Sequence, residues 1–511
     1  MDNKVLEYCA LDGACTFEIR NAIWDDIAKQ GYLPTYKMTI DVFEPLLFMM
    51  TRGIKVDAAE MEHTKRDIQQ KIKDSQDDLN KRVGRELNPF SPKQVQAYFY
   101  LEKGVEPYVG KDGRITCDDK ALQRIARGTA KRAGMREASL IQTIRGLNKL
   151  YSSYLDINFD TDGRLRCAYN PRGTKFGRLS SSETVFGTGT NQQNLPSVFK
   201  RFLVSDDGYF FLEVDKRQAE WVVVAAISGD ANMLEVIRTG ADPHTHTAGL
   251  MFNIPADIIV REHKLIGTLS DPDEITDRRS SDAVIQSIAR ILPRTMSARQ
   301  AGKKANHGLN YDEGPDMFAL SNEIEIREAK RLIDSYHAVY PGIRNSFHEG
   351  VRNQLAKDRT LTNCFGRKVH FLGNWGSDLF KSAYSMLPQS TVVDSLNQGM
   401  RLSYFDDTLT KRLNADILAQ VHDSILFQFP ITLLKQLDKL HSAVERIFDY
   451  VSPQMEYHGR TFKIPTDVKV GYNWGLYGDD NKRGMQEIKP WQNKQQFIKS
   501  ITGALCGKGI K

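Results

Sequence analysis

A ten-residue segment near the C-terminal end most constrains how this chain can fold. It reads Ala419-Gln-Val-His-Asp-Ser-Ile-Leu-Phe-Gln428, with apolar residues on both sides of His422 and Asp423. This pattern predicts two short strands joined by a tight turn. A carboxylate in such a turn is held rigidly near the surface, and hard divalent cations prefer oxygen ligands whose positions are already fixed. Asp423 is therefore a candidate metal ligand.

A second apolar segment, Tyr209-Phe-Phe-Leu-Glu-Val214, also predicts a strand, and it runs directly into Asp215. A helical pattern follows at residues 218–227. The chain thus carries two aspartates at strand ends, which is the arrangement expected of a pair of ligands in a two-metal site.

The composition excludes several classes of protein. A chain of 511 residues with 41% hydrophobic and 26% charged residues is long enough for two to four domains and is not disordered. We expect no membrane association, because the longest apolar runs are too short for a spanning helix. The N-terminus lacks signal-peptide features, and the six cysteines have no CxxC spacing, which predicts a cytoplasmic protein with reduced thiols. The net charge of +6 is compatible with a polyanionic partner.

A polar segment at 169–196 is rich in hydrogen-bond donors and acceptors. Arg178, Asn191 and Asn194 are of the types that contact phosphate, sugar or base edges, although a polar surface loop explains them almost as well. A different segment, the charged stretch Arg261 to Arg279 within 254–292, predicts a mobile insertion.

The segment 295–311 predicts a helix with a basic stripe. Arg299, Lys303, His307 and Tyr311 recur every four residues and therefore share one face. Like charges at this spacing repel each other, whereas a triphosphate would be attracted by them, and Tyr311 could stack on a base. A solvated basic stripe is the alternative.

These segments together resemble the family A DNA polymerases, the bacterial DNA polymerase I type, in the order in which that family carries them. Gln389 also falls in register with the family, whereas Lys381 is a departure, because it stands where the family has arginine. The segments that carry the resemblance are Phe176-Gly-Arg-Leu-Ser-Ser181, Asn191-Gln-Gln-Asn-Leu-Pro196, Asp215-Lys-Arg-Gln-Ala-Glu220 (motif A), Asp242-Pro-His-Thr-His246, Arg299 to Lys303 with Tyr311 (motif B) and Val421-His-Asp-Ser424 (motif C).

The resemblance implies an α+β fold shaped like a right hand, with an antiparallel palm sheet, helical fingers and a thumb. The expected divisions are a remnant of a 3′–5′ exonuclease domain at 1–32, the thumb and connecting helices at 33–165, the palm at 166–230 and 385–475, the fingers at 231–384, and a basic extension at 476–511.

The resemblance also implies an activity: a DNA-directed DNA polymerase that adds dNMP to a primer 3′-OH with two Mg²⁺ ions. Asp215 and Asp423 would hold the ions, and Lys303 would stabilise the triphosphate and protonate pyrophosphate. The implied nucleotide-binding residues are Arg299, His244, Gln218, Glu220, His307 and Tyr311. The implied contacts to primer–template DNA are Arg178, Asn191, Asn194, Gln389, Lys381 and His422.

Two alternatives stay open at this point: a single-subunit, phage-type RNA polymerase, and a non-catalytic DNA-binding protein on a polymerase scaffold. Glu220 favours deoxynucleotides, because in the family a glutamate there excludes a ribose 2′-OH. Two substitutions leave sugar selectivity and metal affinity open, namely Ser424 where the family has Glu and His307 where it has Phe or Tyr.

Both ends of the chain carry further expectations. Tyr8 and Asp12 match the last motif of the family's exonuclease, so we expect a remnant without proofreading, served by a separate exonuclease or processivity partner, in a phage-infected or bacterial cell. The extension has seven Lys and Arg residues against three acidic ones, a net 7 − 3 = +4. A solvated tail and an extra grip on DNA are both consistent with this charge.

Overall fold

An antiparallel sheet of five strands forms the centre of the molecule. The computed structural model describes the chain except residues 1–2, 111–112, 130–131, 270–271, 323 and 507–511. The strand order is β13-β14-β10-β17-β18. The bounds are β10 Tyr209–Lys216, β13 Asp416–Val421, β14 Ser424–Pro430, β17 Thr466–Gly471 and β18 Gln486–Ile488. The two strands predicted around Asp423 and the strand that ends near Asp215 are thereby confirmed.

Alternation along β10 gives the sheet two different faces. Phe210, Leu212 and Val214 pack into a core with α19 (Ser377–Phe405) and α20 (Leu437–Val451). The intervening residues, including Glu213 and Asp215, point to the opposite face, because side chains alternate with a period of two along a strand. The acidic residues of β10 therefore lie on the face away from α19 and α20.

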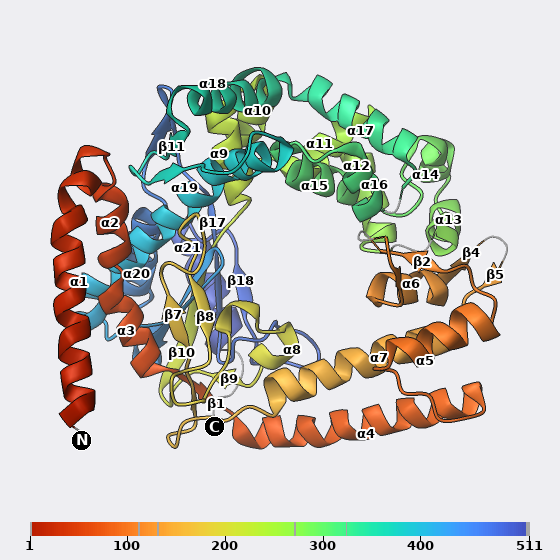
Figure 1. The fold of residues 1–511 in the computed structure, drawn as a ribbon, viewed down its shortest axis with the longest axis horizontal. Coiled ribbons are helices and arrows are strands. Elements are labelled where there is room, and N and C mark those ends of the chain that lie inside the picture. Colours follow the sequence, from red (N-terminus) through yellow and green to blue (C-terminus); the bar gives the residue numbers. More distant parts are fainter. Residues whose placement is uncertain (1–2, 111–112, 130–131, 270–271, 323, 507–511) are drawn as a thin grey trace.

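Two helical regions extend from this sheet (Figure 1). Helix α9 (Ala219–Ser228) follows β10 directly and shares one core with helices α11, α15 and α17. On the other side, α4 (Ala58–Val83) and α7 (Arg136–Leu150) pack against each other and project from the sheet. The predicted α+β right-hand fold is confirmed.

The other main helices are α1 Asn3–Lys29, α2 Leu33–Ile40, α3 Phe43–Arg52, α5 Pro92–Gln96, α6 Asp119–Arg127, α10 Ala231–Thr239, α11 Pro243–Phe252, α12 Ala256–Ile266, α13 Pro272–Ser280, α14 Ala283–Ile288, α15 Ala298–Gly308, α16 Pro315–Asn322, α17 Ile326–Val339, α18 Glu349–Asp358 and α21 Lys494–Ile501.

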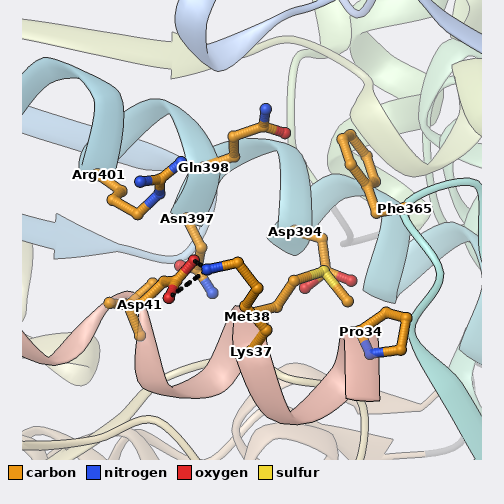
Figure 2. Close-up of a pocket in the computed structure, with 10 residues that line it drawn as sticks. Pro34, Lys37, Met38, Asp41, Phe365, Asp394, Asn397, Gln398 and Arg401 are labelled. Carbon is orange, nitrogen blue, oxygen red and sulfur yellow. Dashed lines mark hydrogen bonds and ion pairs between the residues drawn. The ribbon is translucent and has the colours of Figure 1, made fainter. Parts of the chain in front are cut away.

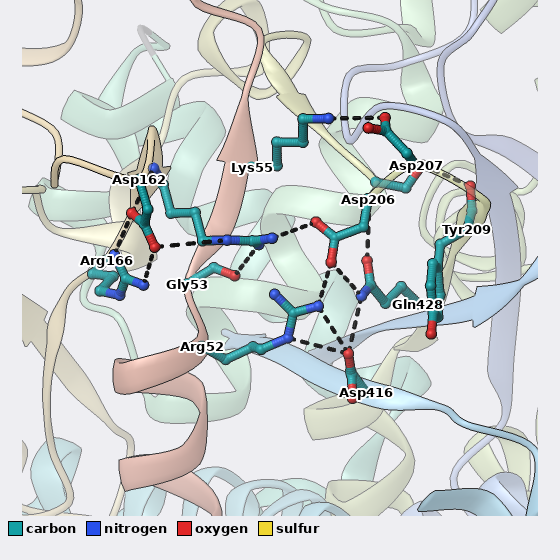
Figure 3. A network of polar contacts seen from close by, with 12 residues as sticks. Arg52, Gly53, Lys55, Asp162, Arg166, Asp206, Asp207, Tyr209, Asp416 and Gln428 are labelled. Carbon is teal, nitrogen blue, oxygen red and sulfur yellow. Dashed lines mark hydrogen bonds and ion pairs between the residues drawn. The ribbon is translucent and has the colours of Figure 1, made fainter.

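A network of charges ties the end of α3 to the sheet (Figure 3). Arg52 pairs with Asp206 and donates to Asp416 at 3.0 Å, while Gln428 donates to both carboxylates at 3.0 Å. Arg164 adds a hydrogen bond of 2.7 Å to Asp206. Burial opposes the ionisation of Asp206, but these donors outweigh it and lower its pKa to about 2. The end of α3 is thus joined firmly to the strands β13 and β14.

The charged stretch at 261–279 is not the mobile insertion that its composition predicts, in the residues that the structure describes. It forms α12 and α13, joined by a fully buried ion pair of 2.5 Å between Arg279 and Glu262. Glu262 also accepts a hydrogen bond of 3.0 Å from the backbone N–H of Ala298, at the start of α15. The expectation was wrong because charge counts do not reveal which charges are paired and buried.

The C-terminal extension is not a solvated tail either. Strand β18 pairs with β17 at the edge of the sheet, and α21 packs against α20. Trp491, Phe497 and Ile501 are buried in the core beneath the sheet. Their apolar surface outweighs the basic charge that suggested a free tail. An additional grip on DNA stays a prediction, and two of its lysines, Lys508 and Lys511, lie outside the described residues.

Tyr8 and Asp12 lie on α1, all of whose described residues are at least partly exposed to solvent. Within the described part of the chain, no three His, Cys, Asp or Glu side chains gather as a metal-binding group. The exonuclease remnant therefore stays a prediction. Among the described helices, none has both the length and the apolar character needed to cross a membrane.

We predict that Arg279→Met destabilises α12 and α13 by about 3 kcal/mol, because it leaves the buried carboxylate of Glu262 without its cation. Urea denaturation and hydrogen–deuterium exchange of these two helices would measure the loss. The matched control is Arg261→Met, which removes the 2.6 Å ion pair between the exposed Arg261 and Asp282. It should cost at most about 1 kcal/mol. Equal effects of the two substitutions would contradict the structural role of the buried pair.

Candidate active site

The turn that carries Asp423 is held by side chains from a distant segment. His422 has a positive φ of 52°, and its backbone N–H donates to Oε1 of Gln193 at 3.0 Å. Gln193 in turn donates to the carbonyl of Gln420 at 2.7 Å. The backbone N–H of Lys216 donates to the carbonyl of Asp423 at 3.0 Å. The position of the carboxylate is therefore fixed by both neighbouring segments of the chain.

Asp215 and Asp423 meet at one cavity of about 260 Å³. Asp215 lies directly opposite Ser424 in the ladder between β10 and β14, and Ser424 follows Asp423. Oδ1 of Asp423 is buried and accepts no hydrogen bond within the described structure. Burial raises the pKa of Asp423, against the opposing charge of Arg178. A buried oxygen without a donor beside a second carboxylate fits a divalent cation, since such ions take oxygen ligands.

Glu220 joins three segments beside this cavity. It lies in the first turn of α9, and its Oε1 accepts a hydrogen bond of 2.5 Å from Arg178. The hydroxyl of Tyr311 donates to its other oxygen. Burial and the charge of Glu220 together raise the pKa of Tyr311 well above its usual value, so the phenol keeps its proton. Arg178, predicted to contact DNA, is thus engaged with Glu220 in the free protein.

Asp242 organises the beginning of α11. It caps this helix by accepting from the backbone N–H of Thr245 at 2.8 Å. Arg299 donates two hydrogen bonds to the same carboxylate, at 3.0 and 3.1 Å, and Gln218 donates to it at 3.3 Å. Gln218 itself sits at a positive φ of 54° between β10 and α9. The predicted nucleotide-binding residues Arg299 and Gln218 are therefore brought together by a shared acidic partner.

Helices α11 and α15 approach closely at Gly302, where a Cβ atom would lie 2.4 Å from the carbonyl oxygen of His244. This close packing brings the rings of His244 and His307 to 6.0 Å. The side-chain amide of Asn306 contacts Nδ1 of His244 at 3.1 Å and so orients the ring. Lys303, also on α15, is exposed and forms no ion pair with any described residue. Of the predicted basic stripe, Lys303 is thus an available cation, whereas Arg299 is already paired with Asp242.

The remaining predicted DNA contacts are spread over two elements. Asn191 caps the 3₁₀ turn at 192–194, and its side-chain oxygen accepts from Ser181 at 2.8 Å and from a backbone N–H at 3.0 Å. Asn194 is exposed. Lys381 and Gln389 are half-buried on α19. The side chain of Asn191 thus stabilises the turn, whereas Asn194 is exposed and Lys381 and Gln389 are partly exposed.

Three charged residues at the cavity were missed by the sequence analysis, namely Lys200, Glu213 and Lys469. Lys469 Nζ lies 2.9 Å from Oδ2 of Asp215 and 3.5 Å from Oε2 of Glu213. Glu213 offered a signal, since it is a charged residue inside an apolar strand, two positions before Asp215 and therefore on the same face. Lys469 offered none, because its position opposite Glu213 depends on the pairing of β10 with β17.

A larger cavity of about 340 Å³ lies elsewhere, between α2 and α19 (Figure 2). It is lined by Met38, Asp394, Asn397 and Arg401, among others. The sequence analysis assigned a function to none of its lining residues. The candidate active site is therefore the smaller cavity that Asp215 and Asp423 share.

Comparison with known proteins agrees with this geometry. The chain matches the family model for DNA polymerase family A at residues 58–268 and 276–476, and it belongs to that family. It is similar to DNA polymerase I of Pseudomonas aeruginosa, with 26% identity over 495 residues that cover 91% of this chain and 47% of the relative. It is also similar to the thermostable DNA polymerase I of Thermus filiformis, with 26% identity over 83% of this chain and 46% of that protein. The chain thus spans about half the length of these relatives.

A solved structure shows the same fold: the POL domain of Pol1 from M. smegmatis, in complex with DNA primer-template and dNTP. The TM-score is 0.71 with 22% sequence identity, and the match covers 90% of this chain and 74% of that one.

We predict that His244 is neutral at physiological pH. Burial, together with the nearby charges of Arg299 and His307, lowers its pKa from 6.5 to about 4, although Asp242 opposes this. An NMR titration of the histidine ring signals should show His244 with a midpoint near 4, and His244→Gln would identify the signal. Because the unfolded chain takes up this proton first, the free energy of unfolding should fall as the pH drops from 6.5 towards 4. A midpoint near 6.5 would contradict the described burial.

Proposed function

We propose that this chain is a DNA-directed DNA polymerase that adds dNMP to the 3′-OH of a primer paired with a DNA template. The observation that carries the proposal is the cavity shared by Asp215 and Asp423, where a buried carboxylate oxygen of Asp423 has no hydrogen-bond donor among the described residues. Family A membership supports it, as does the structural match to a polymerase domain in complex with DNA primer-template and dNTP.

Asp215 and Asp423 would hold two Mg²⁺ ions between them. Such ions, when bound, lower the pKa of an attacking hydroxyl and neutralise the charge of a triphosphate. The chain's own contribution is to keep the two carboxylates in place. The ladder between β10 and β14 and the hydrogen bonds of Gln193 accomplish this.

The basic face of α15 would receive the triphosphate. Lys303 is exposed and without an ion-pair partner in the described structure, so it can approach a phosphate oxygen and pass a proton to the leaving pyrophosphate. Arg299 would exchange its two hydrogen bonds to Asp242 for phosphate oxygens, which suit the same forked geometry. His244, neutral at pH 7, would donate one hydrogen bond.

Glu220 supports a preference for deoxynucleotides. Its two oxygens are held by Arg178 and Tyr311, so the carboxylate cannot swing aside freely to admit a ribose 2′-OH. His307, one turn before Tyr311, would lie near the sugar of the incoming nucleotide. A separate exonuclease or processivity partner, and a place in the cytoplasm of a bacterial or phage-infected cell, stay predictions.

Primer extension on a DNA template tests the proposal. Wild-type protein with Mg²⁺ should extend the primer with dNTPs, and Asp423→Asn should lower the rate about a thousand-fold or more, because it removes a ligand charge at the reacting centre. Binding of labelled primer–template, measured by fluorescence anisotropy, should change little. Tight DNA binding with no extension by the wild type, at any Mg²⁺ concentration, would favour the non-catalytic scaffold instead.

A second experiment tests the role of Glu220. Glu220→Ala should raise incorporation of rNTPs relative to dNTPs by roughly ten-fold or more, because the barrier to a 2′-OH is removed. Tyr311→Phe should shift the ratio in the same direction but less, since it removes only the hydrogen bond that orients the carboxylate. The ratio of kcat/KM values for the two nucleotide types is the measurement. An unchanged ratio in Glu220→Ala would mean that another residue selects the sugar.

A further inference from the structure

Three of the charged side chains on this face of the sheet interact at the candidate cation site. Glu213 and Asp215 are two residues apart on β10 and therefore point the same way. Lys469 on β17 stands directly opposite Glu213 in the antiparallel ladder, whereas Asp467 stands opposite Asp215. Nevertheless the ammonium lies closer to the diagonal Asp215, at 2.9 Å, than to Glu213, at 3.5 Å. One cation is thus placed between two carboxylates.

The two carboxylates differ in their surroundings. Glu213 is 7% exposed, and its Oε1 accepts hydrogen bonds from Nε1 of Trp474 at 3.0 Å and from the hydroxyl of Ser424 at 3.1 Å. These donors anchor Glu213 and leave its Oε2 facing Lys469. The side chain of Asp215 is 36% exposed and lies at the cavity. Asp215 is therefore accessible to an ion from solvent, while Glu213 is a fixed internal anion.

We propose that Lys469 is an internal counter-ion that occupies Asp215 while the cation site is empty and moves to Glu213 when a divalent cation binds. Lys469 and Glu213 are then positioning residues that set the cation concentration at which the site fills. This inference rests on the proposed function in one respect, that Asp215 and Asp423 are the cation ligands.

The movement follows from electrostatics. A divalent cation on Asp215 repels the ammonium of Lys469, and a partly buried ammonium needs an acceptor to remain stable there. Glu213 already lies 3.5 Å away with one oxygen facing the ammonium, so a small side-chain rotation completes the exchange. Glu213 also provides a carboxylate beside Ser424, at a position where the sequence resemblance had indicated that a carboxylate is missing.

The test is direct binding of Mn²⁺ to the free protein, without DNA or nucleotide, followed by electron paramagnetic resonance. Asp423→Asn identifies the share of binding that belongs to this site. Lys469→Met should tighten the binding of Mn²⁺ at this site about five-fold, because Asp215 then has no ammonium to release, and its partly exposed ion pair with Lys469 contributes about that factor. Glu213→Gln keeps the hydrogen bonds to Trp474 and Ser424 but removes the second acceptor. It should weaken Mn²⁺ binding by about the same factor.

Two control variants distinguish the movement of Lys469 from a general change in the electrostatic potential at the cation site. Lys200→Met removes a second cation from the same cavity, one that lies 4.4 Å from the Trp474 ring and forms no ion pair with a described residue. Asp467→Asn removes the anion directly opposite Asp215 without touching an acceptor of Lys469. Both should change the Mn²⁺ affinity less than two-fold, while the double variant Lys469→Met with Glu213→Gln should bind like Lys469→Met alone.

The outcomes separate clearly. Additive effects in the double variant would overturn the proposed movement of Lys469. Shifts in the controls as large as those in Lys469→Met and Glu213→Gln would also overturn it, because a general change in electrostatic potential would then explain all the effects. If Lys469→Met does not fold, an unchanged affinity in Glu213→Gln alone overturns it. No Asp423-dependent Mn²⁺ binding in any variant also overturns it. If Mn²⁺ binds as expected but the wild type extends no primer, the exchange stands and the polymerase proposal fails.

Discussion

The hydrogen-bonded ladders that join β10 to β14 and β17 decide where every charge of the candidate site lies. Asp215 is opposite Ser424 on one side and opposite Asp467 on the other, so the turn with Asp423 necessarily comes beside it. A slip of one residue in either ladder would turn Asp215 towards the helices and bury it among apolar side chains. The apolar residues of the other face, Phe210, Leu212 and Val214, prevent this slip because they would then become exposed.

The same alternation has a cost on the helix face, where Lys216 follows Asp215 and is directed inward. Its ammonium is buried against α19, where it donates to the hydroxyl of Ser395. Burial lowers the pKa of Lys216 to about 7, which measures how unfavourable a charge is at that place. Its backbone N–H, which any residue except proline would supply, holds the Asp423 turn. Position in the ladder, more than side-chain preference, therefore determines the residues around the site.

Sequence patterns predicted those parts of the structure that local periodicity determines. The strand pair around Asp423, the strand before Asp215 and the helix carrying Arg299 and Lys303 all appear where the patterns placed them. Contacts between distant segments could not be predicted in this way, since nothing near Lys469 in the chain indicates that it faces Asp215. Burial was misjudged for the same reason. The stretch with Arg279 and the extension with Trp491 both looked solvated because charge was counted without knowledge of its partners.

In the free protein most charges of the candidate site neutralise one another. Asp215 pairs with Lys469, Asp242 with Arg299, and Glu220 with Arg178. A cation or phosphate that binds to one of these groups therefore has to break an existing ion pair. The binding free energy is then smaller than the new contact alone would give. Such pairing also avoids leaving like charges unbalanced around an empty cavity. Among the exceptions are Oδ1 of Asp423 and the ammonium of Lys303, which have no such partner among the described residues. A cation that binds at Asp423 and a phosphate that binds at Lys303 do not have to break an existing ion pair. The electrostatic free energy that opposes binding is therefore lowest at these two groups.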